Sequence, residues 1–126
     1  MVSNKAKGNN FENMCKKKLE AEGYVVMKSP RSMKMIFTPK GKMFISQAND
    51  YFGLYDLCAK KNFITRWIQC KYGSKSNVST AKKPMQLFHD KYMSESETSE
   101  IWFKEEGSKN LDIYQYDKLT QEYNKT

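Results

Sequence analysis

The sequence predicts an α/β protein with one central mixed β-sheet flanked by helices. Its 126 residues, of which 39% are apolar and 13% aromatic, can bury one modest hydrophobic core. Apolar residues recur at helical spacing near the N-terminus and again past the middle of the chain, and shorter strand-like runs lie between and after these stretches. This alternation is typical of an α/β fold. We expect a single domain over residues 1–117 and a frayed tail over residues 118–126.

The first helix is expected over about residues 10–22, with Asn9 and Asn10 able to cap its start. Its buried stripe consists of Phe11, Cys15 and Leu19, widened by Met14. Gly23 occupies the position where helices commonly end in a left-handed residue. A short buried strand is expected directly after it, over residues 24–27.

Residues 29–49 are punctuated by Pro, Gly and Ser, and their clearest turn is at residues 38–42. They predict a hairpin with residues 33–37 and 43–46 as its arms. Residues 28–42 include five basic side chains and no acid. A mobile basic loop of this kind could lie along a phosphate backbone, and a low-complexity insertion is the alternative.

Two further strands are expected over residues 53–59 and 63–71, joined by a polar turn over residues 60–62. The second strand is strongly apolar, as a central strand should be. Its apolar residues are Ile64, Trp67 and Ile68.

A second helix is expected to begin within about a turn of Pro84, because the missing N–H of proline is tolerated only near a helix start. Its apolar face consists of Met85, Phe88 and Tyr92 or Leu87. A hairpin over residues 100–105 and 111–116 closes the expected fold across a turn at residues 107–109. Its candidates to face inward are Ile101, Phe103, Ile113 and Tyr116.

Positive charge is concentrated in the first two thirds of the chain. The net charge is +8; residues 1–83 hold 17 basic and 5 acidic residues, whereas residues 84–126 hold 5 and 9. Residues 28–83 contain twelve basic residues, interleaved with aromatics, and only two acids, Asp50 and Asp56. This distribution favours a nucleic acid partner over a merely solvated face, because each Lys or Arg placed on a phosphate releases a condensed counterion.

Other classes of protein are disfavoured by what the sequence lacks. No apolar run approaches the length of a membrane helix or forms a signal peptide, so we expect no membrane partner. Cys15, Cys58 and Cys70 are interpreted as reduced thiols, and the only histidine, His89, cannot form a His-rich metal site. We therefore expect a cytoplasmic protein, in the host cytoplasm if it is viral, without a small-molecule cofactor.

The most informative residues are Asp56, Gln69 and Lys71. Asp is unfavourable within an apolar strand, and a buried carboxylate must be paired or hold a metal ion. Gln69 and Lys71 leave the same face of their strand, which Asp56 can approach if the two strands pair. Oxygen ligands gathered there would suit Mg²⁺. An Asp56–Lys71 ion pair is an equally good interpretation of the residue types alone.

Two groups of motifs resemble one nuclease family. Gly8-Asn9-Asn10-Phe11-Glu12, Leu19-x-x-x-Gly23-Tyr24-x-Val26 and Ser29-x-Arg31-Ser32 resemble the opening of the archaeal-type Holliday junction resolvases. Asp50-x-Phe52-Gly53-x-Tyr55-Asp56-Leu57-x-Ala59 and Ile68-Gln69-Cys70-Lys71 resemble the core motif of that group within the PD-(D/E)XK nuclease superfamily. The similarity covers about residues 8–71, with a weaker echo in the final hairpin.

The resemblance implies a Mg²⁺-dependent endonuclease, with Mn²⁺ as an alternative ion, on a restriction-endonuclease-like core. The implied metal ligands are Glu12, Asp56, Gln69 and the carbonyl of Cys70, and the catalytic residues are Glu12, Asp56, Gln69 and Lys71. Lys71 would orient or activate the attacking water, and Asp50 is an auxiliary acid. Gln69 stands where the family usually has an acid, so it brings an amide oxygen without negative charge.

The expected partners are DNA, including four-way junctions, and a second copy in a homodimer. Residues expected to contact DNA are Lys5, Lys7, Ser29, Arg31, Ser32, Lys34, Lys40, Lys42 and Lys75. The alternative function, prompted by Gln69, is a nucleic-acid-binding module that keeps the fold without turnover. A further alternative is a structural interaction protein that uses its acidic C-terminal third as a contact surface.

Overall fold

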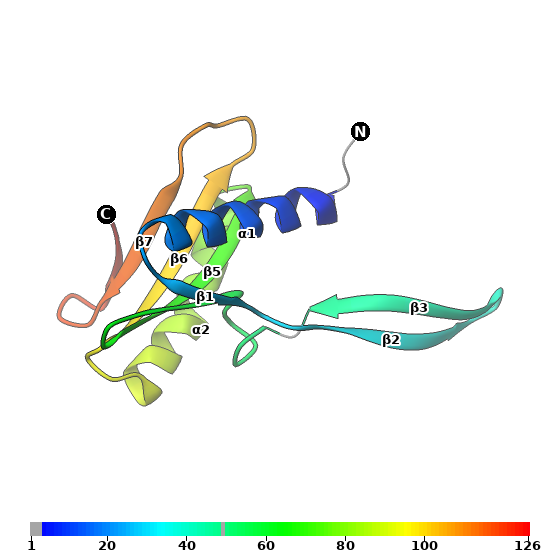
Figure 1. Cartoon of the computed structure of the whole chain (residues 1–126), viewed down its shortest axis with the longest axis horizontal. Helices are drawn as coiled ribbons and strands as arrows, with labels where there is room; N and C mark the ends of the chain where they lie inside the picture. Colours follow the sequence, from blue (N-terminus) through cyan, green and yellow to red (C-terminus); the bar gives the residue numbers. More distant parts are fainter. Residues whose placement is uncertain (1–3, 49) are drawn as a thin grey trace.

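Six strands form one mixed sheet, with helix α1 (Asn4–Ala21) packed on one face and helix α2 (Ser76–Tyr92) on the other (Figure 1). This computed structural model describes the backbone of residues 4–48 and 50–126 and the side chains of residues 7–30, 35, 37–43 and 50–126. The expected α/β class is confirmed. Neither helix in the described part of the chain has the length and apolar character needed to cross a bilayer.

The sheet order is β1-β4-β5-β6-β7-β8. Its strands are β1 (Val25–Lys28), β4 (Leu57–Lys61), β5 (Ile64–Gly73), β6 (Glu97–Glu105), β7 (Asp112–Asp117) and β8 (Glu122–Lys125). Only the β5–β6 pair is parallel, and α2 makes the crossover that a parallel pair requires. Successive β6 side chains alternate between the two cores, with Trp102 facing α1 and Ile101 and Phe103 facing α2.

Helix α1 has the expected buried stripe but begins earlier than expected. Phe11, Cys15 and Leu19 are buried, whereas Met14 is exposed and does not widen the stripe. The cap prediction at Asn9 and Asn10 is wrong, because the helix starts at Asn4; Lys5, Ala6 and Lys7 favour helix and outweigh Gly8. The Asn9 side chain instead accepts a hydrogen bond from Lys28.

Strand β1 is an edge strand, and the prediction that it is buried is wrong. Val26 packs against α1, but Val25 and Met27 are 73% and 65% exposed. The reason lies in its position, since β1 pairs only with β4 and α1 covers only one of its faces. The three cysteines are free thiols, as expected.

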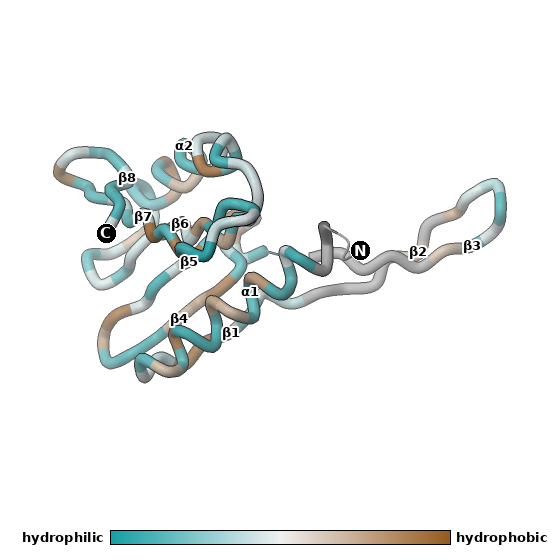
Figure 2. Tube along the Cα trace, turned by 90° about the horizontal axis from the view of Figure 1, so that it is seen from above, coloured by the Kyte–Doolittle hydropathy of each residue, from teal (hydrophilic) through white to brown (hydrophobic). Residues whose placement is uncertain are grey.

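The predicted hairpin is confirmed. Strands β2 (Arg31–Thr38) and β3 (Gly41–Ala48) form a separate two-stranded sheet that projects away from the body in both views (Figures 1 and 2). A two-residue turn joins them, and Gly41 follows it with φ +121°, a conformation that favours glycine. Phe37, near the tip, is 74% exposed.

The strand predicted over residues 53–59 begins only at Leu57. Residues 50–56 form a turn closed by a bridge between Tyr51 and Tyr55, with φ of 55° at Phe52 and 70° at Gly53. Left-handed residues cannot continue a strand, so the ladder starts after them. Asp56 therefore precedes β4 rather than interrupting it, which removes the conflict between aspartate and strand.

Helix α2 begins at Ser76, so the prediction that Pro84 marks its start is wrong. Pro84 lies inside the helix, where packing of Val78 and Met85 into the core offsets the lost backbone hydrogen bond. Of the expected apolar face, Met85 is buried and Phe88 half-buried, but Tyr92 and Leu87 are 64% and 61% exposed.

The closing hairpin formed by β6 and β7 is confirmed, with Ile101, Phe103 and Tyr116 buried and Ile113 half-buried. The expectation of a frayed tail is wrong for residues 122–125, because they form β8 on the outer edge of β7. Tyr123 anchors this strand: its ring is buried, and its hydroxyl contacts Ser99 at 2.9 Å.

Candidate active site

Asp56 lies where β4 begins, and the C-terminal half of β5 extends past it without a β4 partner. Its backbone is held on both sides. The Asp56 N–H donates to the Ile68 carbonyl at 2.9 Å, and its carbonyl accepts the Ser29 N–H at 2.8 Å. Hydrogen bonds to the residue after β1 and to the middle of β5 therefore fix Asp56 beside the half of β5 that has no β4 partner.

Asp56 is 7% exposed, and its carboxylate accepts a hydrogen bond from the Cys70 N–H at 2.8 Å. Burial raises the pKa of this carboxyl to about 8, the Cys70 N–H opposes the rise, and the neighbouring carboxylates of Asp50 and Glu12 add to it. The fold thus brings Asp50, on the same turn, and Glu12, on α1, near enough to Asp56 for their charges to raise its pKa. The roles of Asp56 and Glu12 as metal ligands and of Asp50 as an auxiliary acid stay predictions.

Both neighbouring acids have partners of their own. Ser29 is buried, and its hydroxyl donates to Asp50 Oδ1 at 3.4 Å. The Lys28 ammonium lies 3.4 Å from Glu12 Oε2 and also donates to Asn9 and Asn13. Lys28, which ends β1, is a site residue that the sequence reasoning missed; its only signal was its place in the basic segment.

Gln69 and Lys71 share a face of β5, as predicted, and they contact each other. When the Gln69 amide is oriented to donate to the Leu54 carbonyl at 2.7 Å, its oxygen accepts from Lys71 Nζ at 3.2 Å. Among the described side chains no ion pair joins Asp56 to Lys71. The ion-pair interpretation is therefore not supported, and Lys71 is held by an uncharged partner.

The oxygen atoms of these residues are of the types that bind a hard divalent cation. Carboxylate, amide and backbone carbonyl oxygens are the ligands that Mg²⁺ accepts, and the raised pKa of Asp56 reflects burial and negative charge concentrated at this point. Among the described residues, no group of three or more His, Cys, Asp or Glu side chains is arranged so that it could hold a metal ion by itself. An ion bound here would also need the amide oxygen of Gln69 and the carbonyl oxygen of Cys70 as ligands.

The residues expected to contact DNA separate into groups. Lys40 and Lys42 are exposed near the hairpin tip, and Lys75 is exposed before α2. Lys7 instead pairs with Glu106 at 2.7 Å, and Ser29 positions Asp50 from a buried location. The side chains of the others lie outside the described residues: Lys5, Arg31, Ser32 and Lys34.

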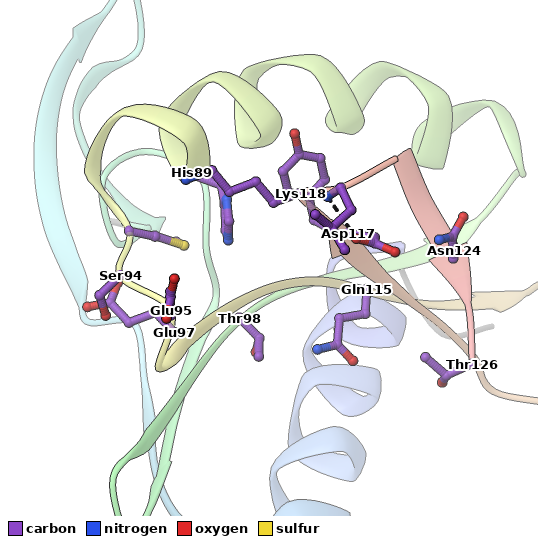
Figure 3. Close-up of a pocket in the computed structure, with 13 residues that line it drawn as sticks. His89, Ser94, Glu95, Glu97, Thr98, Gln115, Asp117, Lys118, Asn124 and Thr126 are labelled. Atoms are coloured by element: carbon purple, nitrogen blue, oxygen red, sulfur yellow. Dashed lines mark hydrogen bonds between the residues drawn. The ribbon is translucent and has the colours of Figure 1, made fainter. Parts of the chain in front are cut away.

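A cavity of about 920 Å³ lies elsewhere, between the end of α2, the start of β6 and the β7–β8 hairpin (Figure 3). Its walls include Glu95, Glu97 and Asp117, and the buried His89 Nδ1, 3.7 Å from Asp90 Oδ1, has no hydrogen-bond partner among the described residues. None of the predicted site residues whose side chains the structure describes lines it. Its acidic walls would repel phosphate, so we place the candidate site at Asp56 and not here.

The Asp56 carboxyl predicts an unusual pH dependence of stability. Because its folded pKa is about 8 and its unfolded value near 3.8, the folded state binds the extra proton between these values. Metal-free stability should therefore fall as pH rises through this window. Relative to Asp56→Asn, the wild-type free energy of unfolding should drop by on the order of 1 kcal/mol per pH unit.

Urea denaturation in EDTA at several pH values measures this difference. Asp112→Asn is the matched control, since it removes a β7 carboxylate that pairs with Lys125 of β8. Its stability should show the same pH dependence as that of the wild type. A parallel pH dependence of wild type and Asp56→Asn would contradict the raised pKa.

Comparison with known proteins finds no matching family model, curated protein or solved structure. The function therefore has to be inferred from the residues of the site and their arrangement.

Proposed function

We propose that this chain is a Mg²⁺-dependent DNA endonuclease that resembles the Holliday junction resolvases and hydrolyses phosphodiester bonds in branched or duplex DNA. The observation that supports this proposal most is the position of the Asp56 carboxylate. It accepts a hydrogen bond from the Cys70 N–H and lies near Asp50 and Glu12, where β4 begins. A mixed sheet with helices on both faces supports the restriction-endonuclease-like core that the resemblance implies.

In this proposal Glu12, Asp56, Gln69 and the Cys70 carbonyl hold the ion, with Mn²⁺ as a substitute. Such an ion would polarise the scissile phosphate and supply a nucleophile near neutral pH. Asp56 must give up its proton to bind a cation, so activity should rise with pH as that carboxyl ionises. Lys71, kept in place by Gln69, adds positive charge to stabilise the transition state.

The basic hairpin is the element best suited to lie along DNA. Residues 28–42 carry five basic side chains and no acid, and β2 and β3 extend well beyond the body (Figure 2). A two-stranded ribbon can follow a groove while its lysines neutralise phosphates. A homodimer would present two such arms and two cleavage sites to a four-way junction.

Cleavage assays on four-way junctions and on matched linear duplexes, with and without Mg²⁺, test the proposal. Product is expected only in the presence of the divalent ion, and it should vanish when EDTA is added. Intact DNA under Mg²⁺ and Mn²⁺ across pH 6–9, despite measurable binding, would refute the endonuclease assignment.

The second candidate function is a nucleic-acid-binding module without turnover. The observation that favours it is that the Gln69 amide is satisfied by Leu54 and Lys71 and contributes no negative charge. Such a module would bind DNA with steep salt dependence and cleave none in any divalent metal.

Gln69→Glu separates the two functions. If the wild type is an enzyme, the added charge should lower the Mg²⁺ concentration needed for half-maximal cleavage by about tenfold, because hard cations prefer carboxylates. If the wild type only binds, cleavage should appear where there was none. Gln121→Glu adds the same charge at an exposed turn and should change neither. Unchanged metal dependence of Gln69→Glu in an active enzyme would remove Gln69 from the ligand set.

A further inference from the structure

Phe52 is presented to solvent by a strained turn. Its φ is 55°, a left-handed value that is uncommon for a bulky residue, and the side chain is 61% exposed. The turn is fixed by hydrogen bonds from Tyr51 N–H to the Tyr55 carbonyl at 2.8 Å and from Gly53 N–H to the Asp50 carbonyl at 2.9 Å. Strained backbone conformations cluster at functional sites, and here the strained residue exposes its apolar ring instead of burying it in the core.

The ring of Phe52 is held firmly even though it is exposed. Its centroid lies 4.7 Å from that of Phe88 at a 33° tilt and 5.3 Å from that of Trp67, which meets it edge-on. Phe88 in turn lies 4.9 Å from Tyr92. The result is a short aromatic ladder along α2 whose outer member, Phe52, is largely open to solvent.

The surroundings of the ladder suit a nucleic acid. The turn that carries Phe52 also carries Asp50 and Asp56. Phe52 and Asp56 are four residues apart, so their Cα atoms can be at most about 14 Å apart. Four stacked nucleotides of one DNA strand span about the same distance. The Lys91 ammonium lies 5.4 Å from the centre of the Tyr92 ring, at the other end of the ladder. Aromatic faces next to cations are the elements from which single-strand binding surfaces are built.

We propose that Phe52 is a stacking platform for an unpaired base, so that the preferred substrate is DNA with unpaired nucleotides beside the scissile phosphate. This inference rests on the proposed function for the position of that phosphate. A base inside a duplex has both faces covered, whereas a base at a flap, an overhang or an open branch point offers a free face to the ring. Phe52 thereby distinguishes branched or frayed DNA from continuous duplex.

A second copy of the chain fits this surface less well. An aromatic side chain presents about 150–250 Å², so Phe52 and Tyr92 at 61% and 64% exposed offer roughly 200–300 Å² together. A stable protein interface needs about 800 Å² from each partner. The patch has the dimensions of one or two bases, and the net charge of +8 favours a polyanion over a copy with the same charge.

The test is a fluorescence titration in EDTA, so that binding is read without cleavage. Two DNAs of equal length carry 2-aminopurine, one in an unpaired flap and one within continuous duplex. Wild-type protein should quench the flap probe and bind that DNA more tightly. Phe52→Ala should lose the quenching and weaken flap binding by about 5- to 100-fold more than duplex binding. Phe52→Trp should restore both, because the larger ring still stacks.

Phe63→Ala is the matched control, since Phe63 is 91% exposed in the β4–β5 turn at the other end of the strand, and it should behave as wild type. Equal quenching by wild type and Phe52→Ala would overturn the inference, as would a complete lack of DNA binding. So would conversion of a dimer to a monomer by Phe52→Ala with equal losses for both DNAs. Phe52-dependent quenching without cleavage in Mg²⁺ would sustain the inference and reject the endonuclease. Cleavage that is indifferent to Phe52 would do the reverse.

Discussion

Replacing Asp56 by alanine is expected to reduce Mg²⁺-dependent cleavage on the order of 10³-fold or more, because it removes the carboxylate about which the site is arranged. The Cys70 N–H loses its acceptor, and the acids that remain are Glu12, on α1, and Asp50, at the start of the same turn. Single-turnover cleavage of a four-way junction with saturating enzyme measures the loss without contribution from product release.

Binding provides the control for this variant. In EDTA at pH 9, where the Asp56 carboxyl is ionised, Asp56→Ala should bind the junction at least as tightly as the wild type, since one negative charge near the phosphate is gone. Asp112→Asn, on β7, two strands away from β5, should retain full cleavage. Metal-dependent nicking that survives Asp56→Ala would remove this residue from the active site and leave the endonuclease without its carrying observation.

Replacing Arg66 by alanine is expected to destabilise the fold by about 3–5 kcal/mol, because it leaves the buried Glu100 carboxylate without its positively charged partner. Glu100 is fully buried and receives Arg66 Nε and Nη2 at 2.7 and 2.6 Å, Trp102 Nε1 at 3.0 Å and Thr98 Oγ1 at 2.5 Å. The guanidinium also lies over the Tyr24 and Trp102 rings. Urea denaturation at neutral pH measures the change in the free energy of unfolding.

Two comparisons show whether the cost comes from the stranded carboxylate. The double variant Arg66→Ala/Glu100→Leu should recover much of the lost stability, since it removes both charges. Lys7→Ala breaks the similarly short but exposed pair with Glu106 and should leave stability nearly unchanged. A loss of equal size in Lys7→Ala and Arg66→Ala would show that burial of Glu100 is not the source.

Local patterns predicted several elements well. The stripe of Phe11, Cys15 and Leu19 and the turn at residues 38–42 each depend on neighbours in the chain, and both are confirmed. Predictions failed where packing outweighed a local preference. Pro84 lies inside α2, and Tyr123 carries β8 into the sheet, because contacts with distant strands compensate for weak local signals.

The candidate site was predicted in part. The shared face of Gln69 and Lys71 follows from strand alternation, and their contact confirms it. The turn that places Asp56 before β4 was missed, because the left-handed conformation of Phe52 is imposed by the Tyr51–Tyr55 bridge and not signalled by its own residue type. Lys28 was missed because its partners, Glu12 and Asn13, lie on a helix rather than on its own strand.

The sequence by itself determined the α/β class, the basic arm without acids and the set of residue types available for chemistry, since composition and periodicity are local properties. Only the tertiary structure decided which groups meet: Glu12 and Asp50 beside Asp56, Arg66 with Glu100, and Phe52 on Phe88. These meetings depend on strand register and helix placement, which arise from the packing of the whole chain. The local sequence pattern can predict that a side chain is buried, but it cannot predict which charged group or aromatic ring that side chain will contact.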